Sequence, residues 1–259
     1  MAYILNYEKQ HNINSNRAKE HTLEMEKKYE EEIQKCIKDT KLYDNFVAPL
    51  KEVNNNSIKG SLSTLDSVSA VLNLSKGKTA LLNFASYKSP GGLFIEGSMA
   101  QEECLCHYSF LYNVLSQHPD YYEYNNKNLN KSLYTNRALY SPNVIFEKNG
   151  DTKVCDVITC AAPYKAAAKK YCKVSDEENT KALESRIKFV LDIAEDNKVE
   201  TLILGAYGSG VFGQNPKEVA YIFIKTLKSY DYHFEKVIFA IPKGNNNNYE
   251  SFKEVLLQR

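Results

Sequence analysis

The residues most able to do chemistry are two adjacent carboxylates, Glu102 and Glu103, which follow Gln101 and a glycine pair, Gly91 and Gly92. Two carboxyl groups at one site can share glycosidic chemistry, because one moves the proton while the other holds the sugar. Neighbouring residues of a regular helix point about 100° apart, so we expect the two acids to have different roles. A purely structural alternative is that acids in a helix's first turn complement its dipole.

Glycine-rich loops follow two apolar runs that are expected to be buried strands. The loop SPGGLFIEG comes after Thr79–Ala85, and the loop GAYGSGVFGQ comes after Val199–Leu204. Ligands of open α/β sheets bind beyond the carboxyl ends of such strands. Gly208 and Gly210 lack a Cβ atom and can turn backbone N–H groups toward a phosphate, and the positive end of the next helix adds attraction. Either loop alone could be a plain turn, but the two together predict a diphosphate site.

Strand and helix signals alternate along the chain, which predicts an α/β sheet with helices on both faces. The N-terminal part predicts a charged amphipathic helix over about Asn16–Thr40, a short strand over Asn45–Leu50 and a polar turn region over residues 53–67. Residues 119–142, rich in tyrosine and asparagine, are expected to form a long surface connection. Further strands are expected at residues 154–162, 199–207 and 236–242, and further helices from Gln101 and at residues 179–198, 215–230 and 248–259.

Composition restricts the class of protein. The 259 residues are expected to form one domain, 1–259, with residues 1–45 as a helical extension packed on it. The 33 Lys and Arg residues against 32 Asp and Glu give no basic excess, so sequence-specific nucleic-acid binding is not expected. Six cysteines without a CxxC pair argue against a metal or disulfide framework. We expect a cytoplasmic monomer with no membrane association, metal or cofactor.

The segment NFASYKSPGGLFIEGSMAQEECLC, residues 83–106, resembles the signature of microbial-type poly(ADP-ribose) glycohydrolases, which have a macrodomain fold. The likeness continues through SLYTNRALYSPNVIF, ITCAAP, LILGAYGSGVFGQNPKEVA and VIFAIP. The resemblance implies a macrodomain-like α/β/α fold of three layers, with a mixed central sheet and an N-terminal helical extension. It also implies hydrolysis of the ribose–ribose O-glycosidic bond of ADP-ribose chains on modified macromolecules, with release of ADP-ribose.

The resemblance also implies roles for individual residues. Glu103 would be the catalytic acid and base that donates to the leaving 2′-hydroxyl oxygen, and Glu102 would hydrogen-bond the distal ribose. Gly91 and Gly92 would pass close to the diphosphate. The other implied ligand-binding residues are Gln101, Asn83 facing the distal ribose, Gly208, and the closing loop Ser209, Gly210, Val211 and Phe212, of which Phe212 presses on the distal ribose.

Leu93 departs from the family pattern, because it stands where the family has a third glycine. A γ-branched side chain is penalised if that position needs positive φ or a close approach of phosphate, so Leu93→Gly is expected to raise turnover. Two other functions remain open: a module that binds ADP-ribose without cleaving it, and a hydrolase of single ADP-ribose adducts on protein or nucleic acid. The second acid argues against pure binding, because like charges beside an anionic ligand cost affinity.

Four other side chains near these motifs have less specific signals. His107 lies four residues after Glu103 and could reach it on a helix, but a bystander role is expected. Cys104 and Cys106 are expected to be small buried hydrophobic side chains. Tyr207 is a candidate for stacking on adenine, although a core role is expected for any single tyrosine.

Overall fold

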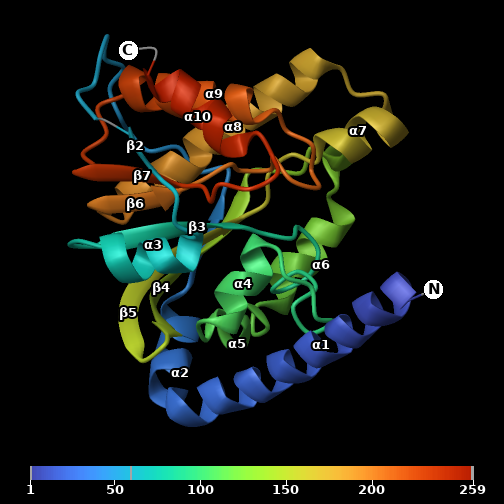
Figure 1. The fold of residues 1–259 in the computed structure, drawn as a ribbon. Helices are drawn as coiled ribbons and strands as arrows, with labels where there is room; N and C mark the ends of the chain where they lie inside the picture. Colours follow the sequence, from blue (N-terminus) through green and yellow to red (C-terminus); the bar gives the residue numbers. More distant parts are fainter. Residues whose placement is uncertain (1, 59, 258–259) are drawn as a thin grey trace.

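The computed structural model describes residues 2–58 and 60–257 and contains a seven-stranded mixed sheet (Figure 1). The strand order is β1-β4-β5-β3-β6-β7-β2. The five strands from β5 to β2 in this order run parallel, whereas β4 and β1 pair antiparallel at one side. The strands are β1 Lys41–Asp44, β2 Gly60–Ser63, β3 Thr79–Phe84, β4 Arg137–Lys148, β5 Asp151–Cys160, β6 Thr201–Leu204 and β7 Lys236–Ala240.

Helices cover both faces of the sheet and make a three-layer arrangement (Figure 1). Helices α8, α9 and α10 pack on one face, and the first five helices pack on the other. None of the helices within the described residues is long and apolar enough to cross a membrane. The helices are α1 Ala2–Lys28, α2 Glu30–Asp39, α3 Ser67–Leu74, α4 Gln101–His107, α5 Leu111–Leu115, α6 Pro119–Lys127, α7 Lys165–Cys172, α8 Asp176–Asp196, α9 Pro216–Ser229 and α10 Asn248–Leu257, with a short 3₁₀ turn at Asn130–Ser132.

The central strand β3 shows why two core layers form. Successive side chains of a strand point to opposite faces, and in β3 all but the last residue are buried. Ala80 and Leu82 belong to the core layer under α8 and α9, whereas Leu81 belongs to the layer under α3 and α4. A strand that is apolar on both faces needs helices on both, which confirms the expected three-layer mixed α/β fold with its N-terminal helix.

The N-terminal elements differ from the sequence expectation. A helix was expected over Asn16–Thr40, but α1 begins at Ala2, and a break at Tyr29 separates it from α2. The Tyr29 ring lies 6.0 Å from that of Phe110 and its hydroxyl donates to Glu147 at 2.8 Å, so contacts with the body of the protein fix the break. The strand expected over Asn45–Leu50 is wrong. The strand in this region is instead β1, Lys41–Asp44, which ends just before Asn45, where the backbone takes a positive φ of 46°.

Two polar segments conceal regular structure. The turn region expected over residues 53–67 contains the edge strand β2, whose serines made it appear loop-like. The surface connection expected over residues 119–142 is also wrong, because it contains α6 and the start of β4. The buried face of α6 consists of Tyr121, Tyr122 and Asn125, and the Asn125 amide donates to the Tyr87 carbonyl at 3.0 Å. A helical face made of tyrosine and asparagine side chains gives no clear apolar period to detect.

Candidate active site

A cleft of about 1220 Å³ opens at the carboxyl ends of the parallel strands. Parallel strands end at the same edge, so the loops after them converge on one region. The cleft is lined by Ser86–Ser89 after β3, by Ala162 and Tyr164 after β5, by residues 206–208 and 210–212 after β6, and by Ile241 and Pro242 after β7. Glu102 and Glu103, in the first turn of α4, also line it. The two glycine loops and the two acids therefore meet in one place.

Glu102 is held by the end of β3. Asn83 faces the same side of the sheet as Leu81, toward α4, because strand side chains alternate. Its amide Nδ2 donates to Glu102 Oε1 at 3.1 Å and lies 3.4 Å from the Thr159 hydroxyl on β5. The Ser86 backbone N–H donates to Glu102 Oε2 at 2.6 Å, so both carboxyl oxygens of Glu102 are bonded.

Gln101 binds to backbone groups at the carboxyl end of strand β3. The pairing of β3 with β6 ends at Leu81, which leaves the next backbone groups of β3 without a strand partner on that side. The Gln101 amide takes their place: its Nε2 donates to the Leu82 carbonyl at 3.0 Å, and its Oε1 accepts from the Phe84 N–H at 2.9 Å. Because the side chain is engaged in these bonds, its structural task is to fix the start of α4. Its role in ligand binding stays a prediction.

Glu103 is held by the first glycine loop. Its Oε1 accepts from the Leu93 backbone N–H at 3.0 Å, and within the described residues its buried Oε2 has no hydrogen-bond partner. Gly92 has a φ of +63°, and a Cβ atom there would lie 2.5 Å from Glu103 Oε1 and 3.0 Å from Glu102 Oε2. Gly91, with φ of +65°, is similarly confined by the Tyr112 ring, 2.8 Å from its Cβ position. Glycine is therefore required at position 92 for the loop to pass this close to the acids, and at position 91 for it to pass the Tyr112 ring.

The carboxyl group of Glu102 has a higher pKa than an exposed acid, because it is buried. Glu102 is 3% exposed, and this burial raises the pKa of its carboxyl to about 8, from the usual 4.5. The hydrogen bonds from Ser86 and Asn83 favour the charged form and lower the pKa, and the charge of Glu103 raises it further. The effect of burial on the pKa is larger than that of the two hydrogen bonds, because removing the charged carboxylate from water costs more free energy than the two bonds supply. Near neutral pH, a protonated Glu102 can donate a hydrogen bond to an oxygen atom of a bound ligand.

This raised pKa predicts a pH dependence of stability. In the unfolded chain Glu102 loses its proton near its usual pKa of 4.5, whereas in the folded protein it keeps the proton up to about pH 8. Between these values the folded state binds the extra proton, so the contribution of Glu102 to stability is present at low pH and lost as pH rises.

We expect Glu102→Gln to remove this loss, so that the stability of the variant relative to wild type improves by on the order of a few kcal/mol from about pH 5 to pH 8. Urea unfolding across this range, with exposed Glu96→Gln as control, measures the difference. Parallel pH curves for wild type and Glu102→Gln would contradict it.

The second glycine loop is held in place by the buried side chain of Gln214. Gly208 has φ of +70°, and a Cβ atom there would lie 2.8 Å from Ala162 Cβ and 2.9 Å from Gln214 Cγ. The buried Gln214 holds the loop, because its N–H donates to the Gly208 carbonyl at 3.0 Å and its amide donates to the Pro163 carbonyl at 2.8 Å. Gly210, by contrast, has open space around its Cβ position, and the structure does not require glycine there.

The tip of this loop forms one wall of the cleft. Val211 is 81% exposed, Ser209 has a buried hydroxyl without a partner among the described residues, and the half-buried Phe212 lines the cleft. The Phe212 ring stacks on Tyr164, with centroids 4.6 Å apart and planes 17° apart. Tyr164 and Tyr134, which also line the cleft, were missed by the sequence analysis. Tyr164 lies in the segment that follows the carboxyl end of β5, four residues after Cys160, so the rule that locates ligands at strand ends could have identified it.

Tyr207, Cys106 and His107 have structural roles, whereas Cys104, which was expected to be buried, is only partly buried and lines the cleft. Tyr207 is fully buried and its hydroxyl donates to the Cys160 carbonyl at 2.9 Å, so it belongs to the core. Cys106 is fully buried, which raises the pKa of its thiol well above the usual value and opposes thiolate formation. His107 packs edge-on against Phe94 at 4.7 Å, and burial followed by the charges of His21 and Arg17 lowers its pKa to about 4.

The position of Leu93 changes the expectation for its replacement. Leu93 is not among the residues with positive φ, and its side chain is 54% exposed at the mouth of the cleft, so the backbone strain assumed from the sequence is not present. We now expect Leu93→Gly to lower kcat/KM about two- to fivefold, because glycine loosens the backbone whose N–H holds Glu103. Steady-state cleavage rates measure this, with Leu93→Ala as the control that removes the side chain without adding backbone freedom. A rate above wild type would restore the original expectation.

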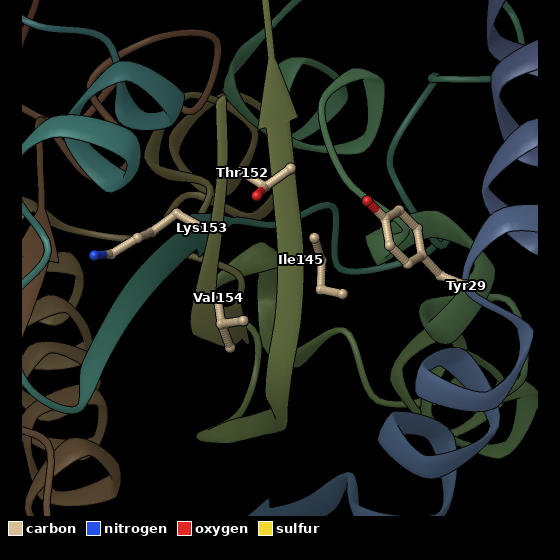
Figure 2. A pocket seen from close by; sticks show the side chains of 5 residues that line it. All are labelled: Tyr29, Ile145, Thr152, Lys153 and Val154. Atoms are coloured by element: carbon tan, nitrogen blue, oxygen red, sulfur yellow. The ribbon is translucent and has the colours of Figure 1, made fainter. Parts of the chain in front are cut away.

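A second hollow, of about 420 Å³, lies away from these loops where the start of α2 meets the β4–β5 hairpin (Figure 2). Figure 2 shows the Tyr29 ring on one side, facing Ile145, while Lys153 points away from it. Its lining consists of Tyr29, Ile145, Thr152, Lys153 and Val154. These residues include neither an acid nor a glycine loop, so the chemistry is assigned to the large cleft. In the described part of the chain, no group of three or more His, Cys, Asp or Glu side chains is arranged to hold a metal ion.

Comparisons with known proteins agree with this geometry. A family model for the catalytic domain of microbial-type PARG, poly(ADP-ribose) glycohydrolase, matches residues 8–149, more than half of the chain. No curated protein matches significantly. Among solved structures, poly(ADP-ribose) glycohydrolase from Thermomonospora curvata is similar with a TM-score of 0.84 and 24% identity, over 94% of this chain and 99% of that one. The Deinococcus radiodurans glycohydrolase in complex with ADP-ribose is similar with a TM-score of 0.74 and 26% identity, over 87% and 97% of the two chains.

Proposed function

Because this chain belongs to the family of microbial-type poly(ADP-ribose) glycohydrolases, we propose that Glu103 is the acid that protonates the leaving oxygen of an ADP-ribose chain. The chain is a glycosidase that hydrolyses poly(ADP-ribose), as its family does. One observation carries the assignment of Glu103: its Oε1 is fixed by the Leu93 N–H, whereas its Oε2 is free of partners among the described residues that line the cleft. A fixed carboxyl with one oxygen available is suited to proton transfer.

The proposed reaction uses Glu103 twice. Its proton passes to the 2′-oxygen of the departing ribose as the bond from that oxygen to C1 of the distal ribose breaks. The resulting carboxylate then takes a proton from water, and the hydroxide oxygen bonds to C1 of the distal ribose, which restores the acid. Glu102, protonated near neutral pH, holds a hydroxyl of the distal ribose, and Asn83 lies beside it on the same side.

The glycine loops supply the grip on the diphosphate in this proposal. Gly92 brings the first loop within contact distance of the acids, Gly91 precedes it at positive φ, and Gly208 of the second loop also lines the cleft. Backbone N–H groups in such loops bind phosphate oxygens without adding positive charge. This suits a chain with nearly equal numbers of acidic and basic residues. Phe212, on its Tyr164 support, would press on the distal ribose.

The test combines binding and turnover. Calorimetry with free ADP-ribose measures affinity, and release of ADP-ribose from poly(ADP-ribose) measures cleavage. We expect both in the wild-type protein. Binding without cleavage would instead indicate a reader of ADP-ribose, and cleavage confined to single ADP-ribose adducts would indicate a different bond as the substrate.

The wider setting is also a proposal. We propose that the chain works as a cytoplasmic monomer, with residues 1–259 as one domain, on ADP-ribose chains carried by modified macromolecules. The balance of 33 basic and 32 acidic residues supports recognition of the ADP-ribose itself rather than of a nucleic-acid sequence.

A further inference from the structure

The N-terminal helix α1 contacts the loop that connects the glycine pair to the two acids. Three side chains of α1 each reach one of three successive carbonyl oxygens of this loop. Ser15 Oγ donates to the Ile95 carbonyl at 2.6 Å, Asn14 Nδ2 donates to the Gly97 carbonyl at 3.1 Å, and His11 Nδ1 lies 3.1 Å from the Glu96 carbonyl. Residues 11, 14 and 15 share one face of a helix, since positions three and four apart are neighbours.

Each of these contacts also orients the backbone N–H of the residue that follows the contacted carbonyl. The C=O and N–H of a planar trans peptide point in opposite directions, so a carbonyl drawn toward α1 turns the next N–H inward. The Gly97 N–H accordingly donates to the Phe94 carbonyl at 3.0 Å, and the Ser98 N–H donates to the Leu93 carbonyl at 3.0 Å. The Leu93 carbonyl is thereby fixed by the segment bound to α1, while its N–H holds Glu103 Oε1 at 3.0 Å.

The fit between α1 and this loop leaves no room for adjustment at Gly97. A Cβ atom there would lie 2.2 Å from the His11 carbonyl oxygen and 2.9 Å from the Ser15 nitrogen, and Gly97 has a φ of +95°. These are backbone atoms of α1, which cannot move aside without moving the helix. The loop and the helix are therefore in direct backbone contact.

Helix α1 packs on the same face of the sheet as α4 and α5. Ala18 and Met25 are buried in the core layer that contains α4 and α5. The Asn113 amide of α5 donates to the Thr22 carbonyl and to Glu26, both at 3.0 Å. Figure 1 shows α1 running past α4 and α5 toward the loop. The helix can therefore act as a fixed support.

We propose that His11, Asn14 and Ser15 are positioning residues for Glu103, which they reach through the loop carbonyls and the Leu93 backbone. This inference rests on the proposed catalytic role of Glu103. It gives the helical extension a task in the reaction: it holds the loop, and hence the acid, in the geometry needed for proton transfer. Small displacements of a catalytic group can cost about 100-fold in rate, so such support has a measurable effect.

Two substitutions remove single donors while keeping the shape of the helix. Asn14→Asp replaces the amide that donates to Gly97 but keeps the oxygen that accepts from Gln10 at 3.0 Å, and Ser15→Ala removes the hydroxyl. Asn16→Asp is the matched control, because Asn16 is exposed on the same helix and the change in charge is identical. Ser15→Thr keeps the hydroxyl and Ser15→Val removes it at the same size, so this pair separates the hydrogen bond from a change in packing.

Two measurements are made on each full-length variant, well below its unfolding temperature. Amide hydrogen exchange of residues 93–98 reports on the order of the loop, and kcat and KM for poly(ADP-ribose) report on function. We expect Asn14→Asp, Ser15→Ala and Ser15→Val to speed exchange in this loop and to lower kcat about tenfold or more, whereas Asn16→Asp and Ser15→Thr stay near wild type.

Each contrary outcome has a separate meaning. Unchanged exchange would show that α1 does not order the loop, and faster exchange with wild-type kcat would show that the order is irrelevant to catalysis. Either result overturns the proposal. If the wild-type protein released no ADP-ribose from polymer, the proposed function would fail instead, and the exchange data would still decide whether α1 holds the loop.

Discussion

Glu103→Gln is expected to lower the rate of ADP-ribose release from poly(ADP-ribose) by about 10²- to 10⁴-fold, the usual contribution of a general acid and base. Glutamine has nearly the same shape and keeps an oxygen that can accept from the Leu93 N–H, so the loop stays in place. The amide that replaces Oε2 cannot transfer a proton to the leaving oxygen. The loss should therefore appear in kcat, while affinity for free ADP-ribose stays within a factor of about three.

Glu96→Gln is the matched control for this experiment. Glu96 lies in the same loop and is exposed, so its substitution makes the same change of charge and shape without touching the cleft. We expect Glu96→Gln to cleave at the wild-type rate. If Glu103→Gln lost binding and turnover in equal proportion, Glu103 would be a structural support of the loop rather than the acid of the reaction.

The sequence predicted those parts of the fold in which the apolar pattern alone determines structure. A helix was expected at residues 179–198, and in α8 the side chains of Leu183, Ile187 and Val190 are fully buried. Strands β3, β5, β6 and β7 are also found where apolar runs predicted them. In these elements burial on one or both faces determines the position, and nothing distant in the chain is needed to see it.

The missed elements depend on partners that are distant in the sequence. Helix α6 buries Asn125 because its amide meets the Tyr87 carbonyl, and edge strand β2 forms because β7 lies beside it. Polar side chains satisfied in this way look like loop residues in a linear reading.

The candidate site was predictable in its residue types but not in its electrostatics. The spacing of the glycine loops and the acids predicted that they converge, and the structure brings Asn83, Gly92, Glu102 and Glu103 together. The sequence could not decide between the effects on the acids, because burial depends on the whole fold. The structure shows that burial prevails at Glu102 and raises its pKa. The concern about Leu93 also required coordinates, since φ cannot be read from residue type.

Gly92→Ala is expected to reduce cleavage about 100-fold or more while leaving the protein folded. The added Cβ atom would lie 2.5 Å from Glu103 Oε1, and the atom that gives way is the end of a flexible side chain, so the fold can adapt by displacing the acid. Displacement of the acid is the change that proton transfer cannot tolerate. Cleavage kinetics and urea unfolding of the same preparation separate the two effects.

Gly150→Ala provides the control for the backbone cost of Gly92→Ala. Gly150 also has a positive φ, of 90°, but nothing lies within 4 Å of its Cβ position, and it belongs to the turn between β4 and β5. Both substitutions should destabilise the protein by about 1–2 kcal/mol, because a side chain is disfavoured at positive φ. Only Gly92→Ala should lose activity per folded molecule, since only its Cβ atom meets Glu103, the proposed acid. Wild-type turnover in folded Gly92→Ala would mean that Glu103 works equally well when displaced, and the close contact between loop and acid would then have no part in catalysis.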